Sequence, residues 1–248
     1  MITGMLVAAL LQAVPVAPPA VPFAVGEEFD YTGKYHSPLF VNITVAHAQL
    51  KVEAIDTVRG VPSWRFRFVG DVAVLWFKNH TDLTSWTGVD DFISRRFKKI
   101  IDEGKYSRRD DFHIYPDSGF FRNNNDTTTT RTPSHPIDDV AFFYFIRTTP
   151  LTVGDSNKYD QYYDGPQNPV VVNVLRREAC DLPDDQKAQC LVLNPVVEVP
   201  HGMLRKDADA RIWITDDARR IPVQIQFNEP GGPVRLKISK IIEPPRPQ

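Results

Sequence analysis

Two alternating segments near the C-terminus decide the fold class: Ala210-Arg-Ile-Trp-Ile-Thr215 and Ile221-Pro-Val-Gln-Ile-Gln-Phe227, joined by Asp216-Asp-Ala-Arg-Arg220. The isoleucines of the first segment share one face, and the apolar residues of the second alternate with two glutamines. A period of two is typical of half-buried antiparallel strands. The stretch therefore predicts a β-hairpin with a charged turn.

The same alternation recurs along most of the chain. Between Val41 and Ala54 the apolar residues change phase, which predicts a long strand with a bulge near His47. The other predicted strands are Phe29–Tyr35, Trp64–Phe68, Thr81–Thr87, Ser94–Asp102, Lys105–Tyr115, Tyr159–Asp164, Val170–Arg177, Cys190–Val199 and Val234–Ile241. We therefore expect an all-β, mostly antiparallel protein.

One segment carries helix signals instead. Ile137–Arg147 has aspartates at its start, a basic residue at its end and Pro150 beyond it, which predicts a short apolar helix. Its β-branched and aromatic residues leave a buried strand as the alternative. The preceding Asn123–Pro136 has no apolar period and is predicted to be a mobile surface loop. Together these features predict a barrel-like or strongly curved sheet with one short helix packed against its concave side.

The N-terminus resembles a secretion signal. The first 26 residues carry no charge, and Met5–Ala13 forms an apolar run that ends in a small residue. No Lys or Arg precedes the run, so a flexible Pro/Ala arm on a cytosolic protein is the alternative. Pro15 interrupts the run before about 20 apolar residues accumulate, so no transmembrane helix is predicted.

Composition and charge limit the function classes. With 42% hydrophobic residues, the 248-residue chain has enough apolar surface for one sizeable core. The formal net charge of -2 argues against a broad nucleic-acid-binding surface. We expect a signal peptide and Pro/Ala-rich leader over 1–24, a single β-rich domain over 25–242 and a disordered tail over 243–248.

The chain has two cysteines, Cys180 and Cys190, with Pro183 and a polar turn between them. In an exported protein this placement suits a disulfide at the base of a hairpin loop, contributing on the order of 2–3 kcal/mol. In a reducing compartment the pair would be two thiols. A metal site needs more ligands than these, and no histidine lies at partner spacing.

Several blocks of the chain resemble the bacterial exported proteins grouped as domain of unknown function 3108. The most specific is Ile212–Val223, and the others are Val25–Tyr31, the basic hairpin Arg96–Arg109, Phe145–Thr148, Leu151–Asp155 and Asp164–Gly165. The resemblance spans about Val25 to Lys240. It implies an envelope location and a curved or barrel-like sheet, but it brings no catalytic residues. The cysteine pair and the charge-poor leader depart from the family pattern.

No constellation of catalytic residues stands out. The histidines, His36, His47, His80, His113, His135 and His201, lack metal-ligand spacing. No phosphate-binding loop or nucleophile elbow occurs. The Asp pairs 90/91, 110/111, 138/139 and 216/217 are expected at turns and element ends, where aspartates cap backbone amides. We therefore expect a protein with no catalytic residues, no metal ligands and no cofactor.

Two features could bind a partner. The basic segment Arg95–Lys99, facing Lys105 and Arg108–Arg109, suits anionic lipid head groups or acidic glycans, or else forms a solvated hairpin with acidic cross-strand partners. The aromatic side chains of Trp64–Phe68 and Phe142–Phe145 suit either a filled core or a pocket under the helix.

These observations predict a non-enzymatic periplasmic or secreted bacterial envelope protein that binds a hydrophobic or amphipathic ligand, lipid or lipoprotein moiety, beneath the Ile137–Arg147 helix. The individual ligand-binding residues are not assigned. The alternative is a structural or assembly partner of another envelope protein, with a filled core and no small-molecule ligand. A nucleic-acid partner is not expected.

Overall fold

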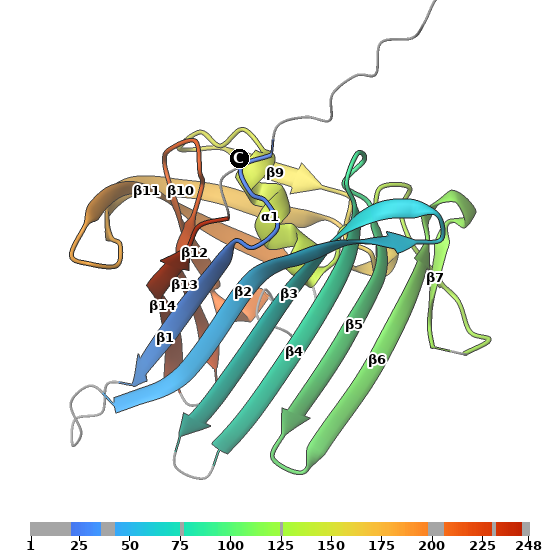
Figure 1. The fold of residues 1–248 in the computed structure, drawn as a ribbon, viewed down its shortest axis with the longest axis horizontal. Helices are drawn as coiled ribbons and strands as arrows, with labels where there is room; N and C mark the ends of the chain where they lie inside the picture. The colour runs from blue at the N-terminus through green and yellow to red at the C-terminus, as the bar shows by residue number, and fades with distance from the viewer. Residues whose placement is uncertain are drawn as a thin grey trace, which may run out of the picture.

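Within the residues that the structure describes, a curved antiparallel sheet of 14 strands surrounds one α-helix in the computed structural model (Figure 1). The structure describes residues 21–35, 43–74, 77–124, 126–197, 206–229 and 232–244. Residues 1–20 of the predicted leader (1–24) and residues 245–248 of the predicted disordered tail (243–248) lie outside these ranges. In the described part of the chain, no helix is long and apolar enough to cross a membrane.

The sheet follows the chain almost in order. The strands are β1 (Glu28–Tyr35), β2 (Ile43–Val58), β3 (Val61–Val74), β4 (Phe77–Gly88), β5 (Ser94–Glu103), β6 (Tyr106–Tyr115), β7 (Phe120–Asn123), β8 (Thr130–Arg131), β9 (Ser156–Tyr159), β10 (Val170–Asp181), β11 (Lys187–Val197), β12 (Arg211–Thr215), β13 (Pro222–Glu229) and β14 (Gly232–Ile242). The remaining elements are α1 (Asp139–Thr148) and three short 3-10 turns, Pro116–Ser118, Gly165–Gln167 and Lys206–Ala208.

Two arms extend from the centre of the sheet. From β1, strands β2 to β8 follow in order on one side, and strands β14 to β9 follow in reverse order on the other. The helix α1 connects β8 to β9, which are the two edges and do not pair, so the sheet is not closed. This confirms the predicted antiparallel, barrel-like or strongly curved sheet with one helix.

Bulges bend the long strand β2. The β1–β2 register shifts where Gly33 and Lys34 face Ala46 and Thr44, close to the bulge predicted near His47. A β-carbon on Gly33 would lie 2.7 Å from the Ala46 Cβ, so only glycine fits this close approach. Because a bulge increases local twist and bending, it helps the sheet curve around its contents.

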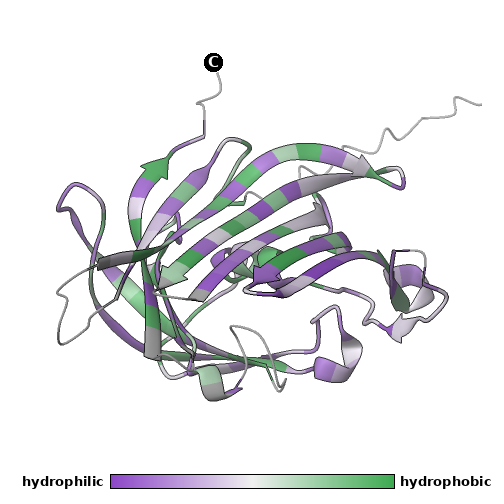
Figure 2. Ribbon diagram, turned by 90° about the horizontal axis from the view of Figure 1, so that it is seen from below, coloured by the Kyte–Doolittle hydropathy of each residue, from purple (hydrophilic) through white to green (hydrophobic). Residues whose placement is uncertain are grey.

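The helix begins where the sequence predicts. Asp138 precedes α1, and its side chain accepts hydrogen bonds from the backbone amides of Val140 and Ala141, which is an N-cap arrangement. Hydrophobic and hydrophilic residues alternate along the strands (Figure 2), so that one face of the sheet packs against the helix. The alternative of a buried strand over Ile137–Arg147 is therefore wrong, because side-chain capping at Asp138 outweighs β propensity here.

Aromatic rings fill the interior. The Tyr144 ring of α1 stacks on Phe66 of β3 with 3.9 Å between ring centroids, and Phe23 packs edge-on against Tyr144 at 5.1 Å. Phe23 is buried in this cluster. The packed domain thus includes residues before the expected boundary at residue 25.

The predicted loop Asn123–Pro136 is partly ordered into the fold. It contains β8, which pairs with β7, and the buried Thr132, whose hydroxyl donates to the carbonyl oxygen of Tyr163 at 2.6 Å. The prediction of a mobile loop is wrong for this part, because a strand of two residues has no apolar period to detect.

Candidate functional site

A small apolar cavity lies against α1. The cavity there, lined by Phe142, Phe145, Tyr162 and their neighbours, has a volume of about 20 Å³, about the space that one water molecule needs. This cavity is too small for an acyl chain. This cavity therefore gives no support to the hypothesised ligand site under the helix.

A buried polar cluster holds the N-terminus of α1. One carboxylate oxygen of Asp138 accepts from two backbone amides, and the other accepts from the Ser85 hydroxyl at 2.6 Å. Burial raises the pKa of Asp138 to about 6, and the hydrogen bonds from the Ala141 amide and from Ser85 oppose the rise. Its oxygens are committed to the cap, so this carboxyl has a structural role.

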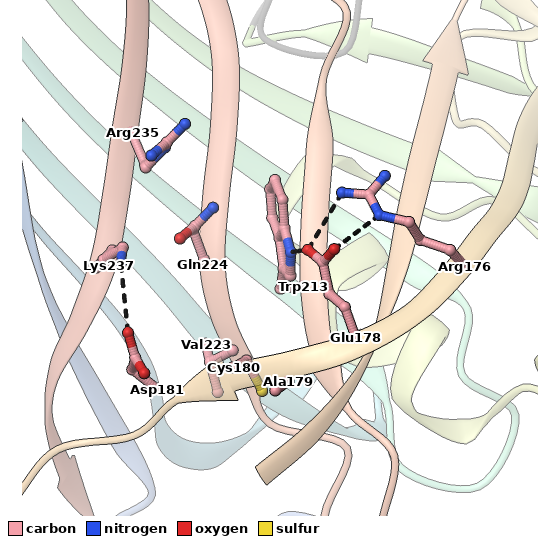
Figure 3. Close-up of a pocket in the computed structure, with 10 residues that line it drawn as sticks. All are labelled: Arg176, Glu178, Ala179, Cys180, Asp181, Trp213, Val223, Gln224, Arg235 and Lys237. Carbon is pink, nitrogen blue, oxygen red and sulfur yellow. Dashed lines mark hydrogen bonds and ion pairs between the residues drawn. The ribbon is translucent and has the colours of Figure 1, made fainter. Parts of the chain in front are cut away.

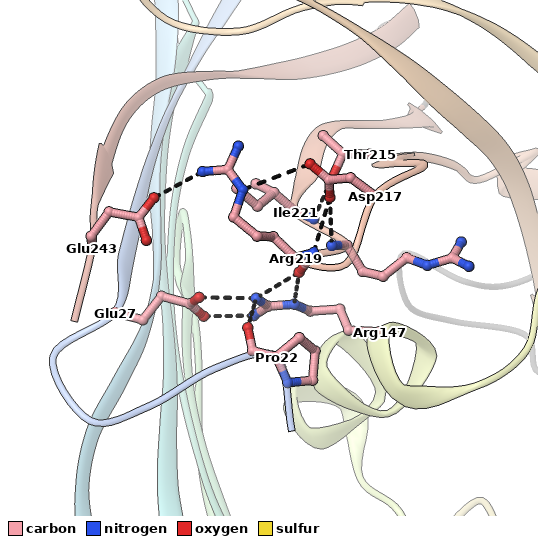
Figure 4. Close-up of polar contacts among 9 residues, drawn as sticks. Pro22, Glu27, Arg147, Thr215, Asp217, Arg219, Ile221 and Glu243 are labelled. Carbon is pink, nitrogen blue, oxygen red and sulfur yellow. Dashed lines mark hydrogen bonds and ion pairs between the residues drawn. The ribbon is translucent and has the colours of Figure 1, made fainter. Parts of the chain in front are cut away.

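Arg147 fixes the other end of α1 to two distant segments (Figure 4). Its guanidinium pairs with the Glu27 carboxylate at 2.6 Å and donates to the carbonyl oxygens of Pro22 and Arg219 at 2.8 and 3.1 Å. The Arg147 side chain has no exposed surface. Burial raises the pKa of Glu27, and the hydrogen bond from Arg147 opposes the rise. These contacts join the N-terminal segment, the helix and the β12–β13 turn.

The predicted basic hairpin, β5–β6, is neutralised by its neighbours. Its ion pairs are Arg95–Asp91, Arg96–Asp111, Lys99–Asp139, Arg108–Asp110 and Arg109–Asp102. Most of the positive charge is therefore compensated within the protein. This favours the solvated-hairpin interpretation over a surface for anionic lipids.

The aspartate pairs have different roles. Asp138 and Asp217 cap backbone amides, as expected. Asp110 and Asp111 lie in the middle of β6, so their predicted position at a turn or strand end is wrong. Carboxylates are tolerated within that strand because Arg108 and Arg96 pair with them.

The long β10–β11 hairpin carries the two cysteines. Cys180 and Cys190 are joined by a disulfide with 5.9 Å between their Cα atoms. The β10–β11 register shifts between Val174 and Arg176, and such a bulge bends a strand. Beyond it, the hairpin crosses the outer face of β12–β14, the face opposite the buried Ile225 and Leu236 (Figure 3).

A groove lies where the hairpin crosses that face. It has a volume of about 320 Å³ and we call it the hairpin groove; its lining residues are Arg176, Glu178, Ala179, Cys180, Asp181, Trp213, Val223, Gln224, Arg235 and Lys237. Figure 3 shows the Trp213 indole standing between the Gln224 amide and the Arg176–Glu178 pair. The groove thus combines one aromatic ring with polar groups from both the hairpin and the sheet.

The two carboxylates of the hairpin groove are ionised and engaged. Glu178 accepts from Arg176 Nε at 2.7 Å and from Trp213 Nε1 at 2.5 Å. The hydrogen bond from Arg176 is the main reason that the pKa of Glu178 lies below its usual value. Asp181 pairs with Lys187, which lowers its pKa, and lies 3.7 Å from the Lys237 ammonium.

Two other polar side chains of the hairpin groove, Arg235 and Gln224, have fewer hydrogen-bond partners. Arg235 Nε donates to Gln226 Oε1 at 3.0 Å, and its guanidinium has no carboxylate partner within the described ranges. The side chain of Gln224 has no hydrogen-bond partner among those same residues. The sheet therefore presents a guanidinium and an amide with spare hydrogen-bonding capacity.

Metal-binding geometry is absent from the part of the chain that the structure describes. No group of three or more His, Cys, Asp or Glu side chains there could hold a metal ion. His80 pairs with Asp71, and His113 lies 3.9 Å from Asp111. His36 and His201 lie outside the described residues.

Sequence reasoning missed the hairpin groove. The sequence places Cys180 and Cys190 in a hairpin and Trp213 on a strand, but nothing in it indicates that the hairpin and Trp213 are in contact. Glu178 and Trp213 are 35 positions apart, and they meet only because the hairpin bends over the sheet. One feature of the sequence does point to the groove: Gln224, Arg235 and Lys237 give the outer face of β13–β14 a polar, basic character.

Comparisons with known proteins agree with this fold. The family model described as "Protein of unknown function (DUF3108)" matches residues 30–239. The chain belongs to this family. No curated protein matches the chain. Since the match covers most of the described sheet, the resemblance seen in the sequence is confirmed.

A solved structure shows the same architecture. The "Beta-barrel-like Protein of Domain of Unknown Function DUF1849" from Brucella abortus is similar with a TM-score of 0.53 and 11% sequence identity. The similarity covers 91% of this DUF3108 chain and 100% of the Brucella chain. At this identity the likeness concerns the fold alone.

Proposed function

We propose that the protein is a non-enzymatic binding protein of the bacterial envelope, and that it holds the polar head of an amphipathic molecule in the hairpin groove. The observation that carries this proposal is the difference between the two cavities. The hairpin groove has about 320 Å³, whereas the space beneath α1 has about 20 Å³. We therefore place the ligand site in the hairpin groove on the polar outer face, and not in the apolar interior beneath α1.

The size of the hairpin groove suits a head group. Ligand pockets in proteins span about 300–1,000 Å³, so the groove lies at the small end of that range. A single ring or a compact polar group fits such a space, whereas a long acyl chain does not. The apolar part of an amphipathic ligand would remain outside the groove.

The charges of the groove favour binding over catalysis. A general acid at neutral pH needs a carboxyl whose pKa is raised. Glu178 and Asp181 instead have pKa values below their usual range, because each accepts a hydrogen bond from a cationic side chain. Two carboxylates with lowered pKa values are suited to holding hydroxyl or ammonium groups of a ligand.

An oxidising compartment suits the groove. The disulfide Cys180–Cys190 lies in the hairpin that forms one wall of the groove. Disulfides persist in the periplasm and outside the cell, and are rare in the cytosol. Together with the signal-like segment Met5–Ala13, this supports export of the protein.

Native mass spectrometry of the protein purified from a bacterial periplasm tests the proposal. Wild type should carry a stoichiometric ligand that solvent extraction releases and identifies. In the variant Trp213→Ala, which removes one wall of the groove, the ligand should be lost. Phe145→Ala, on the helix and away from the groove, is the control that should retain it. A ligand lost from Phe145→Ala but retained by Trp213→Ala would place it beneath the helix and contradict the proposal.

The packed interior also supports a second candidate, a structural or assembly partner with no small-molecule ligand. The sheet is open, so within the described ranges its edge strands β8 and β9 each have one side without a partner strand. A backbone edge pairs readily with another chain. Under this candidate, the purified protein has its bare mass, and cross-linking in cells joins β9 to one defined envelope protein.

A further inference from the structure

We infer that the hairpin groove recognises an acidic, hydroxylated ring, the chemistry of an acidic sugar or of a phosphorylated polyol head group. This inference rests on the proposed function, because it takes the groove as the binding site and names the class of head group. The groove has an anion-binding side, a hydroxyl-binding side and an apolar wall.

The anion-binding side is on β14. Only the Nε–H group of Arg235 donates a hydrogen bond to Gln226. The other N–H groups of its guanidinium can therefore donate to a ligand. Lys237 lies in the same strand and forms a long ion pair of 3.7 Å with Asp181, and its ammonium has further N–H groups that can donate to a ligand. Arginine binds carboxylates and phosphates through two parallel hydrogen bonds, and lysine adds a point charge. These two residues therefore suit one oxyanion group.

The hydroxyl-binding side is formed by Gln224 and Glu178. The Gln224 amide can both donate and accept, and the Glu178 carboxylate only accepts. A hydroxyl group satisfies both kinds of partner, because it is a donor and an acceptor at once. An aromatic or aliphatic acid would cover these polar groups without replacing their hydrogen bonds to water, which costs binding free energy. A ring that carries several hydroxyls avoids this cost.

Trp213, Gln224 and Lys237 lie side by side across three neighbouring strands, so that one ring with an acidic substituent can span them. Trp213 of β12 pairs with Gln224 of β13, and Gln224 pairs with Lys237 of β14. Neighbouring strands lie about 4.8 Å apart, so this row extends over about 10 Å. A ring placed over Trp213 and Gln224 brings an acidic substituent to Lys237 and Arg235. Trp213 is 9% exposed, and the part of its indole that lines the groove offers the C–H groups of the ring an apolar contact.

Titration calorimetry of the full chain with four small compounds tests the inference. The compounds are glucuronate, glucose 6-phosphate, glucose and inorganic phosphate. We expect both acidic sugars to bind at least about tenfold more tightly than glucose, because the neutral sugar lacks the charge-assisted hydrogen bonds to Arg235. Inorganic phosphate, which lacks the ring, should also bind at least about tenfold more weakly.

Three variants assign the contacts. Arg235→Gln should lower the affinity for glucuronate by about tenfold to a hundredfold and leave glucose binding unchanged. Gln224→Leu should weaken both sugars. Arg109→Gln on β6, an exposed arginine outside the groove, is the matched control and should change neither. An Arg235→Gln protein that binds glucuronate as wild type does would overturn the inference.

Vesicles distinguish a free sugar from a lipid head group. Phosphatidylcholine vesicles containing phosphatidylinositol present an acidic hydroxylated ring, and vesicles containing phosphatidylglycerol present the same charge without a ring. Binding of the first alone supports a lipid-borne head. Equal binding to both, or equal affinities for glucose and glucuronate, would overturn the inference. If native mass spectrometry then still finds a ligand that Trp213→Ala loses, the proposed function stands and only the ligand class is wrong.

Discussion

The Arg147 guanidinium and the Glu27 carboxylate form a buried ion pair with two short contacts, 2.6 Å from Nη1 to Oε1 and 2.9 Å from Nη2 to Oε2. The residues are 120 positions apart, one on the last turn of α1 and the other just before β1. The pair therefore fixes the helix inside the curved sheet.

Breaking the Glu27–Arg147 ion pair should lower the free energy of unfolding. Glu27→Gln leaves the Arg147 charge buried without a counter-ion, so we expect the free energy of unfolding to fall by about 3–5 kcal/mol. Glu243→Gln removes a carboxylate from Arg219 at the surface and should cost less than about 1 kcal/mol. Urea unfolding of both variants measures the two losses. Equal losses would show that the buried pair does not hold the fold together.

Two buried tyrosines should respond oppositely to loss of their hydroxyls. The Tyr31 hydroxyl donates to the carbonyl oxygen of Pro222 at 2.7 Å, so Tyr31→Phe should lower the free energy of unfolding by about 1–3 kcal/mol. The buried Tyr144 hydroxyl has no hydrogen-bond partner within the described ranges. Tyr144→Phe should therefore leave stability unchanged or raise it by up to about 1 kcal/mol. Thermal unfolding of each variant separates the cases, and a larger loss for Tyr144→Phe would contradict this assignment.

Stability should depend on pH through Asp138. Its pKa of about 6 in the folded state lies above the ordinary 3.8, so the folded protein holds this proton more tightly than the unfolded chain does. The resulting stabilisation is present below about pH 4 and is lost as the pH rises to about 6. Against Asp138→Asn, which keeps the cap but does not titrate, wild type should lose about 3 kcal/mol over this interval. Unfolding of both proteins across these pH values measures the difference, and a constant difference would show that Asp138 does not titrate there.

Removing the disulfide should loosen the hairpin. Replacing Cys180 and Cys190 together by serine should lower the free energy of unfolding by on the order of 2–3 kcal/mol, because the unfolded chain regains the freedom that the short loop removes. Reduction of wild type should have the same effect, whereas the double-serine variant should not respond to a reductant. A loss in the double-serine variant without any effect of reduction would contradict this explanation.

The sequence predicts elements whose signals are local. The alternation in Ala210–Thr215 and Ile221–Phe227 predicts the hairpin that forms β12 and β13, and Asp138 predicts the start of α1. The pairing of β1 with β14 has no such signal, because the register comes from residues about 200 positions apart in the chain. Local patterns therefore give the fold class, and contacts between distant segments give the arrangement.

The candidate site depends on such distant contacts. Gln224 and the pair Arg235 and Lys237 are visible in the sequence as polar positions of two alternating strands, and Cys180 marks a hairpin. Their meeting requires the bulge between Val174 and Arg176, which has no pattern of its own in the sequence. The buried aromatic residues suggested a pocket under the helix, but the volume that they fill can be known only from the structure.

The most direct test of the account is the position of the ligand in the hairpin groove. Amide and indole ¹H–¹⁵N NMR spectra of the full chain, recorded with and without glucuronate, report it. The account predicts that the Trp213 indole and Gln224 side-chain signals shift, while the backbone signals of Phe142 to Ile146 in α1 stay in place. Shifts confined to α1, with the Trp213 and Gln224 signals unchanged, would contradict it.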